Sequence, residues 1–77
     1  MKTDKLWEYL ETELHYAKES LKKEKNLAER SNICWYAIQR GLGACQFAQM
    51  ASLLTYAEVE PLFEEYKKEL ELMTYDY

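Results

Sequence analysis

The stretch that decides the fold is ICWYAIQRGLGACQFAQMASLL, residues 33–54 of this 77-residue chain. At about 100° per residue, one half of its helical surface carries mostly small side chains, namely Ile33, Cys34, Ala37, Ile38, Gly41, Ala44, Cys45, Ala48, Ala51 and Ser52. Small side chains at this spacing let a neighbouring helix approach closely. We therefore expect a helix that runs to about Leu54 and packs this small face against another helix.

Two glycines leave an alternative open within this segment. Each glycine costs up to about 1 kcal/mol in a helix interior. A turn at Gly41-Leu42-Gly43 would therefore divide the segment and give four helices instead of three. The small face keeps its helical phase across both glycines, which favours one continuous helix.

An amphipathic helix is predicted before this segment. Thr3 is a favourable N-cap, and the lysines near Lys25 suit a helix C-terminus. Its apolar stripe, at spacings of three and four and broken by Glu24, is Trp7, Leu10, Leu14, Ala17, Leu21 and Ala28. Asn26, with Glu29 three residues later, has the spacing of a capping box and is predicted to be the N-cap of the middle helix. Ser31 or Asn32 is the alternative start.

A third helix follows the middle one. Thr55 and Glu58 have the spacing of a capping box, and Pro61 is tolerated only near a helix start. This helix therefore begins at Thr55 or near Glu60, with the apolar stripe Val59, Leu62, Phe63, Tyr66, Leu70 and Met73. The chain is predicted to be one all-α domain over residues 1–77, a three-helix bundle with its middle helix largely buried between the other two.

Charge and polarity limit the partners. The net charge is −4, and Glu58–Tyr77 alone carries seven acids against two lysines. Nucleic acids and anionic membranes are bound by basic surfaces, so we expect neither as a partner. Arg40 is the only charge in residues 33–57, but the glutamines there indicate a buried helix and not a membrane span. The charged start, MKTDKLWEYLETE, is unlike a secretory leader. Cys34 and Cys45 are too far apart on one helix to pair, so we expect buried thiols and a cytoplasmic protein.

Catalytic and metal-binding patterns are weak. Glu8, Glu11, His15 and Glu19 share one helix face, but no second histidine exists, and the face is predicted to be solvated. Either cysteine could meet His15 only through tertiary packing, and a buried thiol is inert. The sequence therefore predicts a non-enzymatic protein without metal or cofactor.

A helix-turn-helix DNA-binding regulator is the alternative function. Ala37 and Gly41 have the spacing seen where the first helix of that motif meets its turn, and Leu42 would be the apolar turn residue. Gln46 and Gln49 could then read adenine edges. That second helix has no Arg or Lys for phosphates, which weighs against DNA binding.

Aromatic side chains suggest a protein interface. The chain has seven tyrosines and two tryptophans, and several fall outside the apolar stripes. Aromatic residues on such second faces are enriched in interfaces. The sequence therefore predicts a protein-interaction module, a homo-oligomer or a binder of a larger protein, whose interface contains Tyr9, Tyr16, Trp35, Tyr36, Phe47, Met50 and Leu54.

Overall fold

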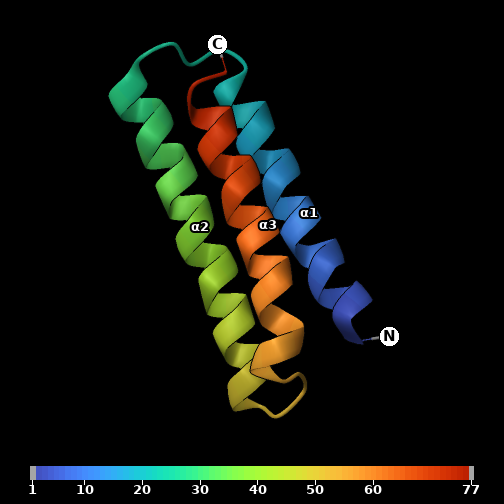
Figure 1. The fold of residues 1–77 in the computed structure, drawn as a ribbon. Coiled ribbons are helices and arrows are strands. Elements are labelled where there is room, and N and C mark those ends of the chain that lie inside the picture. The colour runs from blue at the N-terminus through green and yellow to red at the C-terminus, as the bar shows by residue number, and fades with distance from the viewer. Residues whose placement is uncertain (1, 77) are drawn as a thin grey trace.

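The computed structural model describes residues 2–76 and shows a small all-α three-helix bundle (Figure 1). The helices are α1 (Lys2–Leu21), α2 (Leu27–Met50) and α3 (Tyr56–Thr74). They hold 84% of the described residues, and no strand occurs within that range. Successive helices run in opposite directions, so the end of α3 lies beside the connection from α1 to α2 (Figure 1).

The predicted caps at Asn26 and Thr55 and the continuous middle helix are confirmed. The Asn26 side chain accepts a 3.0 Å hydrogen bond from the Glu29 N–H and starts α2. At the start of α3, Thr55 accepts from the Glu58 N–H while the Glu58 carboxylate accepts from the Thr55 N–H, which completes a capping box. α2 passes through both glycines without a break, so the bundle has three helices and not four.

Three predicted helix ends are wrong. Thr3 lies inside α1, α1 ends at Leu21 and not near Lys25, and α2 ends at Met50 and not near Leu54. The reason at the end of α2 is a Schellman turn. Ser52 adopts a left-handed φ of 58°, and the Leu53 N–H reaches back to the Ala48 carbonyl at 2.9 Å.

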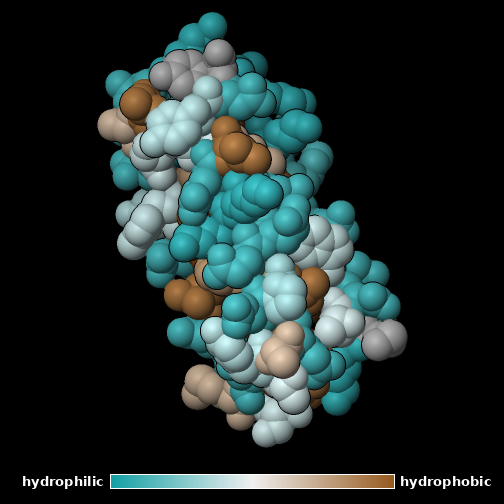
Figure 2. Space-filling view, viewed as in Figure 1, coloured by the Kyte–Doolittle hydropathy of each residue, from teal (hydrophilic) through white to brown (hydrophobic). Residues whose placement is uncertain are grey.

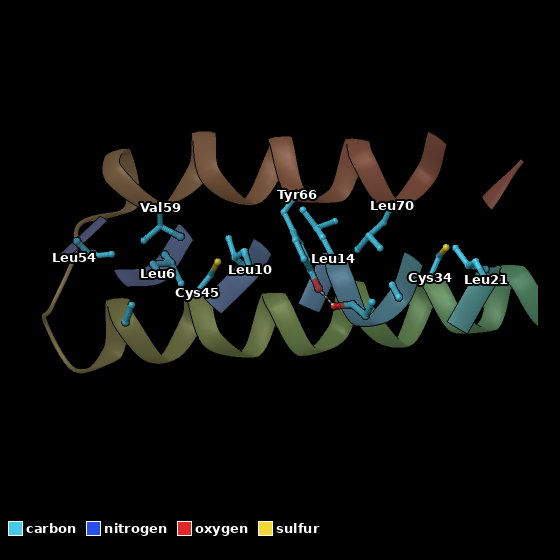
Figure 3. Packing of buried hydrophobic residues seen from close by; sticks show 13 residues of the cluster. Leu6, Leu10, Leu14, Leu21, Cys34, Cys45, Leu54, Val59, Tyr66 and Leu70 are labelled. Atoms are coloured by element: carbon cyan, nitrogen blue, oxygen red, sulfur yellow. Dashed lines mark hydrogen bonds between the residues drawn. The ribbon is translucent and has the colours of Figure 1, made fainter. Parts of the chain in front are cut away.

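This turn corrects one predicted interface residue. Because the chain reverses after α2, Leu54 returns to the core beside Val59 and Leu6 and is only 7% exposed (Figure 3). Leu54 therefore belongs to the core and not to an exposed interface. Ala51 and Ser52, predicted on the small face, are exposed for the same reason.

The core runs along the bundle axis between all three helices (Figure 3). Its buried apolar residues are Leu6, Leu10, Leu14, Ala17, Leu21, Cys34, Ala37, Cys45, Ala48, Leu54, Val59, Tyr66 and Leu70. In α1 the stripe starts at Leu6, with Trp7 only partly buried, and Ala28 is exposed at the start of α2. From Ile33 to Ala48 the small face of α2 thus packs inward as predicted.

The middle helix is not the centre of the fold. Each pair of helices packs together, α1 with α3 included, so the three form a triangle. α2 therefore buries only its small face, and the prediction that it is largely buried is wrong. Its other half is left to solvent.

Candidate functional site

The exposed half of α2 carries four large apolar side chains in solvent. Trp35, Tyr36, Phe47 and Met50 are 56%, 59%, 65% and 84% exposed. At 100° per residue these four fall within about 120° of arc, on the side opposite the small face. We call this surface the α2 outer face, made of Trp35, Tyr36, Gln39, Gly43, Gln46, Phe47 and Met50.

This surface has almost no charge. Between Ser31 and Ala57 the only residue that carries a charge at neutral pH is Arg40. Its Nε donates a 2.6 Å hydrogen bond to the Glu13 carboxylate of α1, so its charge is already paired at the border of the α2 outer face. A charge-poor surface with large apolar side chains resembles the core of a protein interface.

Two predicted interface tyrosines lie on α1. Tyr9 is 42% exposed and Tyr16 is 60% exposed. Partial burial, together with the nearby Glu13 carboxylate, raises the pKa of Tyr9. Tyr9 therefore borders the Glu13–Arg40 pair, at the junction of α1 and α2. Six of the seven predicted residues are thus exposed, and Leu54 is not.

Gly43 lies in the middle of the α2 outer face. A Cβ placed on Gly43 would meet nothing within 4 Å, in contrast to one placed on Gly41. No contact among residues 2–76 therefore requires a glycine at this position. The helix backbone is open there to a close approach from outside.

The face that has α3 in front looks different. Figure 2 shows hydrophilic residues over its middle and apolar colour in separate patches towards its ends. Leu72 of α3 and Tyr75, the residue that follows α3, are 65% and 71% exposed. They stand among acidic neighbours, Glu69, Glu71 and Asp76. This surface lacks the charge-poor character of the α2 outer face.

Arg30 has a structural role that the sequence pattern did not predict. Its side chain is buried, with 2% of the residue exposed. Its guanidinium donates hydrogen bonds of 2.6–2.9 Å to five backbone carbonyls, those of Leu21, Glu24, Met73, Thr74 and Asp76. The carbonyls of Leu21, Met73 and Thr74 belong to the last turns of α1 and α3, where helical donors are missing. Those of Glu24 and Asp76 lie just beyond these helix ends. Arg30 therefore connects the C-terminal ends of α1 and α3. Its guanidinium N–H groups are used in these hydrogen bonds within the fold.

The catalytic and metal candidates do not come together. No group of three or more His, Cys, Asp or Glu within residues 2–76 is arranged to hold a metal ion. His15 is exposed on α1, whereas Cys34 and Cys45 are buried and free. Desolvation raises the pKa of the Cys45 thiol, which disfavours the reactive thiolate.

The helix-turn-helix alternative loses its structural basis. It needs a turn at Gly41–Gly43, and α2 is a single helix through these residues. Gln46 therefore lies on the same helix as Ala37 and not on a separate recognition helix. Among the described residues, no helix is both long enough and apolar enough to cross a membrane.

Comparisons with known proteins give no relative. No family model matches the chain, and neither a curated protein nor a solved structure matches it.

Proposed function

We propose that this chain is a non-enzymatic, cytoplasmic protein-interaction module that forms a homodimer through the α2 outer face. The observation that carries the proposal is that Trp35, Tyr36, Phe47 and Met50 are all more than half exposed on one charge-poor face. Interface cores are enriched in aromatic residues and methionine and depleted of charge. The two free, buried thiols fit a reducing compartment.

Charge favours a second copy as the occupant. The only charged residue on this side of α2, Arg40, is neutralised by Glu13 of the same chain. The surface therefore offers no attraction to a strongly acidic or basic partner. A two-fold axis places one such neutral surface against another, so the same patch serves both sides.

The register of the α2 outer face suits an antiparallel crossing at Gly43. Tyr36 and Met50 each lie seven residues, about two helical turns, from Gly43. In an antiparallel pair centred on Gly43, each Tyr36 thus faces Met50 of the second copy. Sulfur–aromatic contacts of this kind are favourable, and the open Gly43 backbone permits close packing.

The exposed area indicates a weak dimer. An aromatic side chain can bury about 150–250 Å². The exposed parts of Trp35, Tyr36 and Phe47 therefore supply about a third to a half of the roughly 800 Å² per partner found in standard interfaces. Met50 and the flanking glutamines add to this. We therefore expect a dimer with a dissociation constant in the micromolar range and not a permanent dimer.

Sedimentation equilibrium over a concentration series up to tens of micromolar tests the proposal. The unmodified chain should approach the mass of a dimer. Tyr36→Glu/Met50→Glu places four carboxylates in the dimer interface and should weaken association at least about tenfold, or 1.4 kcal/mol.

The matched control is Leu72→Glu/Tyr75→Glu, at the C-terminal end of α3. It adds the same charge at two equally exposed apolar positions outside the α2 outer face. This variant should dimerise like the unmodified chain. A monomeric mass for the unmodified chain at every concentration, or equal weakening in both variants, would overturn the proposal.

A further inference from the structure

A second apolar surface lies where α1 begins and α2 ends. It is a groove of about 390 Å³, and the residues that line it are Lys2, Lys5, Leu6, Tyr9, Ala44, Phe47, Ala48, Leu53 and Leu54. Leu6, Ala48 and Leu54 are buried residues of the core and form its floor. Tyr9, Phe47 and Leu53 are 42%, 65% and 45% exposed and form its walls. The groove therefore offers apolar contacts without any rearrangement of the core.

The charged residues along the groove are both cationic. Lys2 and Lys5 are exposed, and the Lys5 ammonium lies 4.0 Å from the Glu8 carboxylate, at the limit of an ion pair. Both lysines lie in the first turn of α1, where the helix dipole adds positive potential. The same turn also holds Asp4, but of these three residues only the lysines line the groove. The groove thus combines an apolar floor with one end that attracts carboxylates.

We propose that this groove binds an amphipathic helix of an acidic partner protein. Its apolar side chains pack between Tyr9 and Phe47, and its Asp or Glu side chains pair with Lys2 and Lys5. This is the helix-in-groove mode of recognition, in which apolar anchors at helical spacing enter a hydrophobic channel.

The exposure of the Tyr9, Phe47 and Leu53 side chains favours a helix over a small molecule as the occupant of the groove. Sites for small ligands bury about 70–90% of the ligand surface. Here the Phe47 wall is itself mostly exposed, so a small molecule would stay largely in water. A helix lying along the groove covers the walls as well as the floor.

This site goes beyond the proposed dimer and can be separated from it. Phe47 borders both surfaces, but Lys2 and Lys5 belong only to the groove. Trp35 and Tyr36 belong only to the α2 outer face. A Trp35→Ala/Tyr36→Ala variant should therefore lose self-association and still bind the acidic helix.

Titration of the isotope-labelled chain with two stapled helices, followed by NMR amide shifts, tests the inference. The first probe is a leucine–glutamate amphipathic helix, and the second has lysine in place of every glutamate. The glutamate helix should shift amides of the groove residues in a saturable way and bind at least about tenfold more tightly than the lysine helix.

Charge reversal supplies the decisive pair of variants. Lys2→Glu/Lys5→Glu should weaken the glutamate helix at least about tenfold and strengthen the lysine helix. Lys23→Glu/Lys68→Glu makes the same change in net charge at exposed positions that do not line the groove, and should leave both affinities within about twofold. Absence of saturable binding, amide shifts outside the groove, or equal weakening in the two variants would overturn the inference.

Discussion

The ring of Tyr66 occupies the space that a side chain at Gly41 would need. A Cβ built on Gly41 would lie 2.8 Å from both Cδ2 and Cζ of that ring and closer still to Cε2. The Tyr66 hydroxyl donates a hydrogen bond to the carbonyl of Ala37, one turn before Gly41 (Figure 3). Gly41 therefore lets a large aromatic side chain reach the α2 backbone, where its buried hydroxyl finds an acceptor.

The two glycines of α2 should respond oppositely to alanine. Gly41→Ala forces the buried Tyr66 ring to move and should lower the free energy of unfolding by about 1–3 kcal/mol. Gly43→Ala meets no neighbour and should raise it by about 0.5–1 kcal/mol through helix propensity. Urea unfolding at concentrations too low for association measures both. Shifts of the same sign would contradict this packing.

Stability should fall at alkaline pH, with Tyr66 responsible for part of the fall. Burial, followed by the Glu13 charge, raises the pKa of Tyr66 above its ordinary value of 10.0. Because the unfolded chain ionises first, the contribution of the protonated Tyr66 is complete below about pH 10 and is lost as the pH rises towards the folded pKa. The limiting slope is about 1.4 kcal/mol per pH unit.

The comparison for this effect is Tyr66→Phe, which keeps the ring and removes the hydroxyl. The variant should be less stable by about 0.5–1.5 kcal/mol at neutral pH, because one hydrogen bond is lost. Its stability should then fall less steeply above about pH 10. Urea unfolding across the alkaline range measures both slopes, and equal slopes would show that Tyr66 ionises normally in the folded state.

Helix periodicity and cap spacing predicted most of this fold. The Asn26 and Thr55 caps follow from residues within three positions of each other, so local sequence is enough to find them. The phase of the small face also predicted that α2 continues past its glycines. The end of α2 was misjudged because Ser52 occupies the left-handed position where glycine is usual, and no sequence signal marked the turn.

Arg30 shows what a charge-based analysis misses. Its charge alone predicts an exposed side chain, yet it is buried. Its signal was its phase, because it lies four residues before Cys34 and seven before Ala37, on the same side of α2. The five carbonyls that it caps come from helix ends far apart in the sequence. Only the tertiary arrangement brings those ends together, so the exposed candidate residues could be predicted better than this buried one.

The Schellman turn leads to a stabilising substitution. Ser52 has a φ of 58°, a conformation that costs an L-residue roughly 1–2 kcal/mol and costs glycine little. Ser52→Gly should therefore raise the free energy of unfolding by about 0.5–1 kcal/mol. The gain is smaller than the relieved strain because glycine has greater conformational freedom in the unfolded chain. Thermal unfolding measures the change. Ser52→Ala keeps the strain and should bring no gain, so equal stabilisation by both variants would argue against the turn.

Removal of Arg30 should be among the most destabilising single changes. Arg30→Met keeps much of the buried volume but leaves five carbonyls without this donor. Hydrogen bonds to charged groups contribute about 1.5–3 kcal/mol each and do not add, so we expect a loss of at least about 2 kcal/mol. Arg30→Lys retains the charge without the planar fork of donors, so its free energy of unfolding should lie between those of the unmodified chain and Arg30→Met. Urea unfolding gives the ranking, and hydrogen exchange should show faster opening of the last turn of α3.

Arg40→Met is the matched control for Arg30, because it also removes one guanidinium from α2. The Arg40 side chain is 48% exposed and makes one charged hydrogen bond, to the Glu13 carboxylate, whose side chain is 14% exposed. We therefore expect its loss to cost less than the loss of the five hydrogen bonds of the buried Arg30. The two variants change net charge equally, so a difference between them isolates the capping of helix ends. If Arg30→Met costs no more than Arg40→Met, the carbonyls at the ends of α1 and α3 are satisfied without Arg30. The end of the bundle would then be held by its apolar contacts alone, chiefly those of Leu21 and Leu70.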